Sequence, residues 1–219
     1  MPAAAASILL AALLDEECAP VEVARTRLSV HYETGRDDVP VLCVGLPAAV
    51  RLPNMLVSPV LPSGPLRVAA GTLRSGADTW RVGRWWQPPR PQARAARPRL
   101  GCTLDPAALV GRGPGLTPAG DDVLAGALVA ARAVRHPMLA TWCAATRDVL
   151  RARRTTAVSW GLLHHALDGW AVPELAAYVE QPRRSSVRDR LLAVGHSSGA
   201  ALADGVGRVL AADAREAVA

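Results

Sequence analysis

The segment GRGPGLTPAGDD, residues 111–122, combines residue types that can bind a small anion. Its four glycines allow a loop to turn several backbone N–H groups toward one point, and Thr117 adds a hydroxyl group. The spacing matches neither the dinucleotide-binding G-x-G-x-x-G pattern nor the P-loop. The segment therefore predicts an anion site without indicating a dinucleotide. Asp121 and Asp122 follow directly, at the expected start of an apolar helix.

Two adjacent aspartates at a helix start allow three interpretations. They can cap the helix and interact favourably with its dipole, which is a structural role. They can hold Mg²⁺ between the protein and a phosphate, because carboxylate oxygens are the ligands that this ion prefers. They can also accept hydrogen bonds from a substrate amide. The sequence leaves these three roles of Asp121 and Asp122 open.

A second helix start, TTAVS at residues 155–159, carries three hydroxyl groups, on Thr155, Thr156 and Ser159. Capping of the helix that follows is the structural interpretation. The functional interpretation is that these hydroxyls join the glycine-rich loop in a common site. Both interpretations predict that a helix begins at about residue 156.

The sequence GHSSG at residues 195–199 fits the G-x-S-x-G pattern of hydrolase nucleophiles, with Ser197 as the nucleophile. That motif requires a buried strand before the serine, but apolar residues recur at helical spacing over 185–194. The acid and the histidine of that fold follow the serine, and no histidine follows Ser197. We therefore predict a helix–helix corner in which Gly195 ends one helix and Ser197 caps the next.

The last helix, predicted over 197–213, carries small residues at Gly199, Ala203 and Gly207. This i, i+4, i+8 spacing places them on one face, where another backbone can approach closely. The free N–H groups at the start of the helix carry partial positive charge and can bind an anion. We expect 111–122, 155–159 and 195–198 to line one cleft.

The composition excludes several chemistries. The 219-residue chain has no lysine, so its 25 basic residues are all arginines. A P-loop lysine, a pyridoxal Schiff base and a Ser-Lys dyad are therefore excluded. The arginine-rich, alanine-rich composition is typical of GC-rich coding, so the net charge of +6 does not indicate a nucleic-acid partner. The four cysteines form no C-x-x-C pair, which argues against a zinc site.

The hydrophobic patterns predict an α+β protein in which a small antiparallel sheet or barrel precedes a helical bundle. Strands are expected over 21–32, 39–46, 54–60, 66–73 and 78–86. Helices are expected over 120–135, 138–152, 156–169, 173–180, 185–194 and 197–213. The apolar stretch 3–14 predicts a surface or packing helix in a cytoplasmic protein, because it is too short to span a membrane and has no basic residues before it.

The stretch 87–101 is rich in proline and arginine and predicts an exposed linker. The alternative is a basic arm that binds RNA or an acidic partner. We accordingly predict a β-rich portion over 1–100, which includes this linker, and a helical portion over 102–219 that carries the motifs.

Three segments, GRGPGLTPAGDDVLAG, RTTAVSWGLLHHALDG and LLAVGHSSGAALADG, in this order and spacing, resemble a bacterial family. That family includes the AllH subunit of oxamate carbamoyltransferase from anaerobic allantoin breakdown. The resemblance covers about residues 100–210 and is only general before them. It implies carbamoyl transfer that interconverts oxalurate and carbamoyl phosphate, and it implies two unlike partner subunits.

Carbamoyl phosphate, oxamate and oxalurate are small anions, so the predicted site is compatible with this reaction. Carbamoyl transfer needs positioning and charge stabilisation more than a protein nucleophile. The candidate catalytic residues are Asp121, Asp122 and His196, of which His196 would protonate a leaving group. The candidate ligand-binding residues are Gly111, Arg112, Gly113, Gly115, Thr117, Gly120, Thr155, Thr156, Ser159, Ser197 and Ser198.

The leading hypothesis is a carbamoyltransferase-type subunit that works with unlike subunits and binds a small phosphate or carboxylate, with Asp121 and Asp122 as possible Mg²⁺ ligands. The alternative is a non-catalytic protein that binds a small anion or a nucleotide and regulates a partner. A serine hydrolase comes third. Neither a nucleic acid nor a membrane is expected as a partner.

Overall fold

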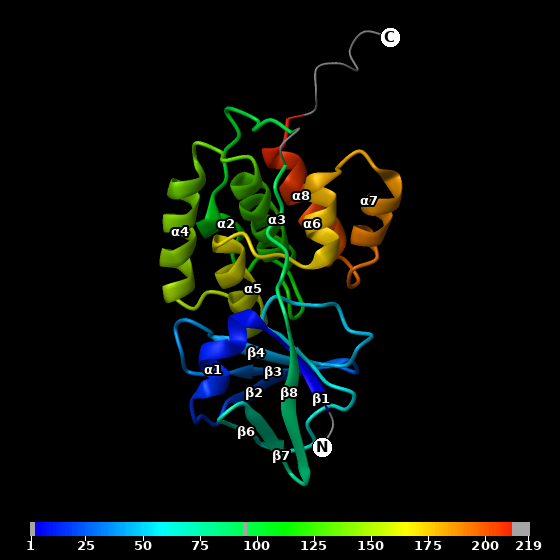
Figure 1. The fold of residues 1–219 in the computed structure, drawn as a ribbon. Helices are drawn as coiled ribbons and strands as arrows, with labels where there is room; N and C mark the ends of the chain where they lie inside the picture. Colours follow the sequence, from blue (N-terminus) through cyan, green and yellow to red (C-terminus); the bar gives the residue numbers. More distant parts are fainter. Residues whose placement is uncertain (1–2, 94–95, 212–219) are drawn as a thin grey trace. The chain divides into compact units, whose positions relative to one another are not determined.

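A computed structural model describes residues 3–93 and 96–211 (Figure 1). The chain forms two compact units. Unit 1 comprises Met1–Pro88 with Trp160–Leu162, and unit 2 comprises Pro89–Ser159 with Leu163–Ala219. The fold is α+β, as expected, with strands in the first part of the chain and helices in the second. No helix within the described ranges is long and apolar enough to cross a membrane.

Unit 1 contains one eight-stranded, nearly closed sheet with the order β2-β3-β4-β5-β1-β8-β7-β6. The strands are β1 (Ala3–Ser7), β2 (Val21–Arg25), β3 (Ser29–Glu33), β4 (Val41–Gly45), β5 (Met55–Val57), β6 (Leu66–Ala69), β7 (Thr72–Ser75) and β8 (Asp78–Trp86). The pairs β4–β5 and β1–β8 are parallel, and the other neighbours are antiparallel. The expected sheet or barrel is confirmed.

Two stretches that the sequence predicts as single strands are hairpins. In the stretch 21–32, the Thr26 hydroxyl accepts hydrogen bonds from the N–H groups of Leu28 and Ser29, and this turn separates β2 from β3. In the stretch 66–73, Gly71 has a φ of 71° and turns the chain between β6 and β7. Continuous apolar alternation across a tight turn explains why each hairpin resembles one long strand.

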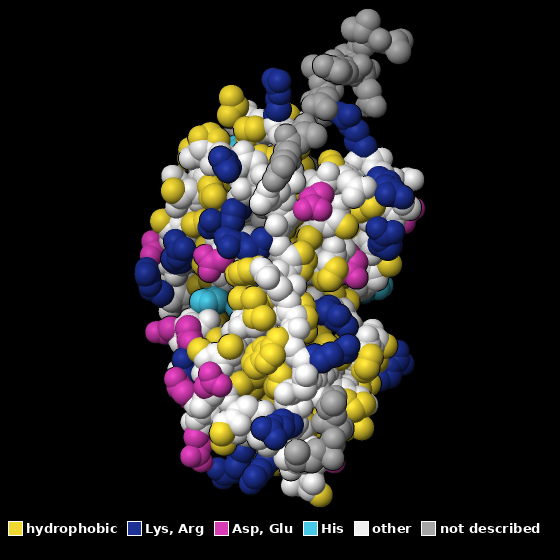
Figure 2. Space-filling view, in the orientation of Figure 1, with side chains coloured by type: hydrophobic (Ala, Val, Ile, Leu, Met, Phe, Trp, Pro, Cys, Tyr) yellow, Lys and Arg dark blue, Asp and Glu magenta, His cyan; other side chains and the backbone are white. Residues whose placement is uncertain are grey.

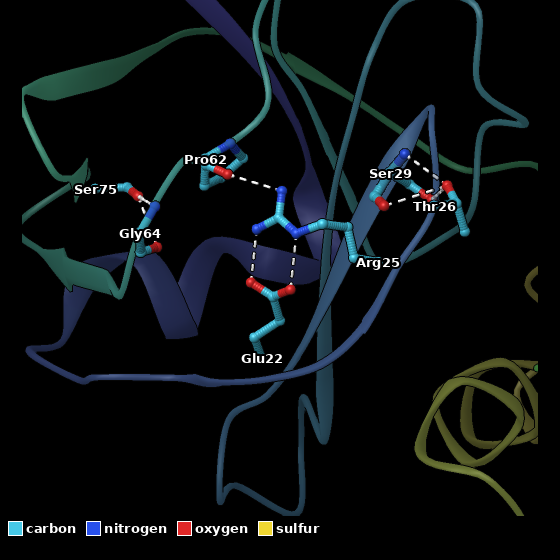
Figure 3. Close-up of polar contacts among 7 residues, drawn as sticks. All are labelled: Glu22, Arg25, Thr26, Ser29, Pro62, Gly64 and Ser75. Carbon is cyan, nitrogen blue, oxygen red and sulfur yellow. Dashed lines mark hydrogen bonds and ion pairs between the residues drawn. The ribbon is translucent and has the colours of Figure 1, made fainter.

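The two edge strands of the sheet, β2 and β6, are linked by polar contacts (Figure 3). Arg25 on β2 forms a bidentate ion pair with Glu22 and donates a 3.0 Å hydrogen bond to the Pro62 carbonyl, before β6. Backbone hydrogen bonds of 2.9 and 2.8 Å also join Cys18 to Val68 on β6. These contacts join the segments beside the two edge strands, while most residues of β2 stay exposed.

The start of the chain is a strand and not the helix expected over 3–14. β1 lies between β5 and β8, and Ala4 and Ala6 belong to the buried core of unit 1. The Ser7 side chain then caps a short turn. The helical part consists of η1 (Ile8–Leu10) and α1 (Ala11–Asp15). Pairing on both sides outweighs the helix preference of alanine.

The helices after β8 are α2 (Pro106–Leu109), α3 (Ala119–Ala133), α4 (Leu139–Arg151), α5 (Ala157–Leu167), α6 (Pro173–Glu180), α7 (Ser185–Leu192) and α8 (Ser198–Val209). The six expected helices are confirmed. Only the last differs by more than two residues at one end, since α8 ends at Val209 and its predicted end, 213, lies outside the described residues. The additional short helix α2 is capped by the Asp105 carboxylate.

The described part of the stretch 87–101 packs along unit 2. The Pro89 carbonyl accepts a hydrogen bond from the N–H of Ala171, and the N–H of Ala93 donates to the Ala133 carbonyl. An isolated antiparallel β-bridge also joins Pro98 to Leu210. The sequence predicts an exposed linker, but Pro91 and Ala93 are buried. Frequent prolines fix an extended backbone here, and apolar contacts hold it on the helices. The assignment of domains over 1–100 and 102–219 stays a prediction.

Helices α3 and α8 approach each other closely at two glycines. A Cβ atom at Gly126 would lie 2.2 Å from the Leu202 carbonyl oxygen, and one at Gly205 would lie 2.0 Å from the Val123 carbonyl oxygen. Of the small residues predicted on one face of α8, Gly199 does meet another backbone, because a Cβ there would lie 1.9 Å from the Leu191 carbonyl oxygen. Gly207 is exposed, and no described atom lies within 4 Å of a Cβ there. The predicted close approach is therefore confirmed at Gly199 and wrong at Gly207, and α3 packs against α8 at Gly205.

Candidate functional site

Asp121 joins the glycine-rich loop to the start of α5. It lies in the first turn of α3, and its side chain is buried. One carboxylate oxygen accepts a 2.8 Å hydrogen bond from the N–H of Gly111, and the other accepts from the Thr155 hydroxyl. Both oxygens therefore have protein partners, and the residue holds two sequence-distant segments together.

Asp122 has a different environment. Its side chain is 4% exposed, and its Oδ2 has no hydrogen-bond partner among the described residues. Burial raises the pKa of Asp122 to about 6; hydrogen bonds from Ser198 and Thr117 act to lower this pKa, and the nearby Asp121 acts to raise it. A carboxyl group with such a pKa changes its charge near neutral pH.

Thr117 and Ser198 connect the loop with the start of α8. Their hydroxyl oxygens are 2.9 Å apart, and either can donate. Both hydroxyls lie close enough to the Asp122 carboxyl group to lower its pKa. Three helix-start segments that are distant in sequence thus meet through side-chain hydrogen bonds in unit 2.

At the start of α5, Thr156 has the predicted capping role, because its Oγ1 accepts from the N–H of Ser159 at 3.1 Å. Its hydroxyl also donates to the Leu116 carbonyl at 2.6 Å, which ties α5 to the glycine-rich loop. Ser159 is buried, and its Oγ has no partner within the described part of the chain.

Two glycines of the loop are required by close backbone approach. Gly111 has a φ of 76°, and a Cβ there would lie 2.3 Å from the Arg154 carbonyl oxygen. A Cβ at Gly120 would lie 2.0 Å from the Leu109 carbonyl oxygen. Gly113 and Gly115 also have left-handed backbone conformations.

In the first turn of α3, the backbone N–H groups are already hydrogen-bonded, so the polar groups that this turn adds to the cluster are the two carboxyl groups. The N–H groups of Gly120, Asp121 and Asp122 donate to carbonyls within unit 2. The N-cap residue is Pro118, so neither aspartate caps this helix, but both lie in its first turn, where they interact favourably with the helix dipole. The prediction of free N–H donors is wrong for these three residues, because the loop folds back and its carbonyls take the hydrogen bonds. Arg112 is exposed at the loop.

The corner between α7 and α8 has the predicted form. Helix α7 precedes it, Gly195 has a φ of 61°, and Ser197 occupies the N-cap position of α8. The Ser197 side chain, however, makes no capping hydrogen bond to any described residue. Its φ of −132° and ψ of −13° differ from the extended backbone of a typical N-cap. His196 and Ser197 are exposed.

We predict that Ser197 is not a nucleophile. The residues before it form a helix and not a strand, and no histidine follows it in the sequence. A fluorophosphonate probe is expected to leave Ser197 unmodified, as measured by mass spectrometry of the labelled protein. Stoichiometric modification of this serine would contradict the prediction.

A metal site finds limited support in the arrangement. Among the described residues, no three or more His, Cys, Asp or Glu side chains form a group that could hold a metal ion. The Asp121 oxygens already accept hydrogen bonds, so Mg²⁺ would depend mainly on Asp122. The Mg²⁺ hypothesis stays a prediction, as does the hypothesis that all the candidate residues line one cleft.

The fold and this cluster define the class of the protein: an α+β chain in which hydroxyl and carboxyl groups meet where helices α3, α5 and α8 begin. Residues 109–210 match the family model described as "Oxamate carbamoyltransferase subunit AllH". The match spans the whole cluster and supports this family for the chain. No solved structure matches the chain.

Proposed function

We propose that this chain is a subunit of a carbamoyltransferase of the oxamate type, and that the cluster at the starts of α3, α5 and α8 binds the carbamoyl-bearing substrate. The match of residues 109–210 to the AllH family supports the reaction class and the need for unlike protein subunits. The hydroxyl and carboxyl groups of the cluster support the position of the binding site within unit 2.

The observation that carries the binding proposal is the Asp122 carboxyl group, which is buried with one oxygen unpartnered among the described residues. Leaving a buried acceptor without a donor costs about 1–3 kcal/mol. A carbamoyl group ends in an NH₂, whose N–H groups match such an acceptor. Substrate binding would therefore supply the hydrogen bond that the protein itself does not make.

The anionic part of the substrate requires different groups. The chain has no lysine, so Arg112 is the cationic side chain of the loop. The hydroxyls of Thr117 and Ser198 are 2.9 Å apart, so when one donates to the other, the second hydroxyl can donate to a phosphate or carboxylate oxygen. We assign the carbamoyl NH₂ to Asp122 and the charged end to these three residues.

In the proposed reaction, the amide nitrogen of oxamate attacks the carbamoyl carbon, and the bond from that carbon to the phosphate oxygen breaks. The electron pair leaves with the phosphate, and the oxamate nitrogen loses a proton. Asp122, with a pKa of about 6, is suited to accept this proton. The exposed His196 is the candidate donor to the departing phosphate. The products are oxalurate and inorganic phosphate.

The proposal is tested by purifying the tagged chain from its own cells, together with any unlike subunits that it retains. We expect the purified assembly to form oxalurate from oxamate and carbamoyl phosphate, with one phosphate released per carbamoyl group transferred. An assembly that binds carbamoyl phosphate without transfer would favour the alternative, a regulatory anion-binding protein. An assembly that neither binds nor transfers would contradict both hypotheses.

A further inference from the structure

A polar cavity lies at the C-terminal end of α3, away from the Asp122 cluster. It has a volume of about 640 Å³ and lies wholly within unit 2. Helix α3 has 15 residues, so its two ends are separated by about 22 Å. The cavity is lined by Arg90, Pro91, Gln92, Ala93, Ala96, Val129, Arg132, Ala133, Val134, Arg135 and Gly169. It is therefore separate from the cluster around Asp122.

Three arginines line this cavity, and its described lining includes no aspartate or glutamate. None of Arg90, Arg132 and Arg135 forms an ion pair with a described residue. Two acidic residues contact or neighbour the lining: Glu180 accepts a hydrogen bond from the N–H of Gln92, and the exposed Asp168 precedes Gly169. Figure 2 shows arginine side chains gathered beside the extended segment that follows β8.

Two of these arginines are held in place by the protein. Arg132 donates to the Leu167 carbonyl, and its aliphatic stem packs on Gly169, where a Cβ would lie 2.5 Å from Arg132 Cδ. The Arg90 guanidinium lies 4.7 Å from the ring centre of Trp170, in a cation–π contact. Both positive groups are thus ordered before any ligand arrives, which reduces the entropy lost on binding.

The third arginine, Arg135, occupies a backbone position that favours glycine. Its φ is 54°, and it follows Val134, the C-cap residue of α3. Glycine is the usual residue where a helix ends in this left-handed conformation, because an L side chain is strained there. This protein has an arginine at this position instead of glycine, and Arg135 lines the cavity.

The negative end of the α3 dipole does not cancel this positive charge. The last four carbonyl groups of the helix, from Ala130 to Ala133, all accept hydrogen bonds. Their donors are the N–H groups of Val134, His136, Arg135 and Ala93. Because the carbonyls are paired, the three guanidinium groups dominate the local charge.

We propose that this cavity is a binding site for a small polyanion that carries phosphate or carboxylate groups. Guanidinium groups match both kinds of oxyanion in bidentate geometry. A cavity of about 640 Å³ has the size of a small-molecule site, which favours a metabolite over an acidic protein surface. This site does not depend on the proposed carbamoyltransferase function.

The test is calorimetric titration of the full chain with pyrophosphate and, separately, with citrate. The variant Arg135→Gly removes one guanidinium and places glycine where the backbone favours it. We expect at least tenfold weaker binding of whichever probe binds, with no decrease in melting temperature. The tighter of the two probes shows whether the site prefers phosphate or carboxylate groups.

Arg188→Ala is the matched control, because this exposed arginine of α7 carries the same charge outside the cavity. It should leave binding unchanged, as should Asp122→Asn at the other end of α3. Failure of both probes to bind the native chain would overturn the proposal. Equal binding by the native chain and Arg135→Gly would also overturn it, whatever the outcome at Asp122.

Discussion

Gly205→Ala is expected to destabilise the protein by about 3 kcal/mol or more, because the new methyl group has no space. A Cβ at this position would lie 2.0 Å from the Val123 carbonyl oxygen and 2.8 Å from the Ala127 nitrogen, both in the backbone of α3. Backbone atoms within a helix cannot move aside as a flexible side chain can. Urea unfolding followed by circular dichroism measures the change.

Gly207→Ala is the control in the same helix. No described atom lies within 4 Å of a Cβ at Gly207, and alanine is favoured over glycine inside a helix by about 1 kcal/mol. This variant should therefore be as stable as the native chain or slightly more stable. Equal effects of the two substitutions would contradict the close contact of α3 with α8, on which the pairing of Thr117 with Ser198 depends.

Asp122→Asn is expected to stabilise the protein above pH 6. The folded-state pKa of Asp122 is about 6, against an ordinary value of 3.8. The folded chain therefore binds this proton more tightly than the unfolded chain. The free energy of unfolding consequently falls as the pH rises from about 4 to about 6 and Asp122 loses its proton in the folded state. Above that range the buried charge costs about 3 kcal/mol, which asparagine avoids.

The measurement is the free energy of unfolding of the native chain and Asp122→Asn between pH 4 and pH 8. The two proteins should be about equally stable near pH 4, and the variant should be more stable, by up to about 3 kcal/mol, at pH 8. A variant that is less stable than the native chain at pH 8 would contradict the burial of an unpartnered carboxylate. If Asp122→Asn is more stable than the native chain, Asp122 does not serve stability, which would indicate that it serves function.

Local patterns predict much of this fold. Helical spacing identifies six helices, and the glycine after α7 identifies the corner before α8. The strand β1 is missed, because alanine and leucine favour a helix locally and only its two neighbouring strands show that residues 3–7 are extended. The spacing of small residues correctly marks Gly199 for a close backbone approach but not Gly207, and it does not indicate that α3 contacts Gly205.

The sequence predicts which residues form the candidate site, but it does not predict which of them contact one another. The sequence singles out Asp121 and Asp122, but it does not distinguish the two. Only the fold shows that Asp121 binds Gly111 and Thr155, whereas Asp122 lies against Thr117 and Ser198. The sequence marks only part of the arginine-lined cavity, the basic stretch 87–101 that supplies Arg90, because Arg132 and Arg135 come from a separate segment and arginine is frequent throughout the chain.

Calorimetric titration of carbamoyl phosphate into the native chain, Asp122→Asn and the control Asp189→Asn tests the central claim most directly. Asp189 is an exposed aspartate of α7, so its substitution changes the charge equally outside the cluster. The titrations are run at pH 7.5 with and without Mg²⁺, which separates a direct hydrogen bond from a metal bridge.

Asp122 should contribute tenfold or more to carbamoyl phosphate affinity, which corresponds to about 1.4 kcal/mol, and Asp189 should contribute nothing measurable. If Asp122 accepts from the carbamoyl NH₂, inorganic phosphate should bind the native chain and Asp122→Asn about equally. Carbamoyl phosphate binding that is identical in all three proteins, or absent from the native chain, would contradict the assignment of the cluster as the carbamoyl site.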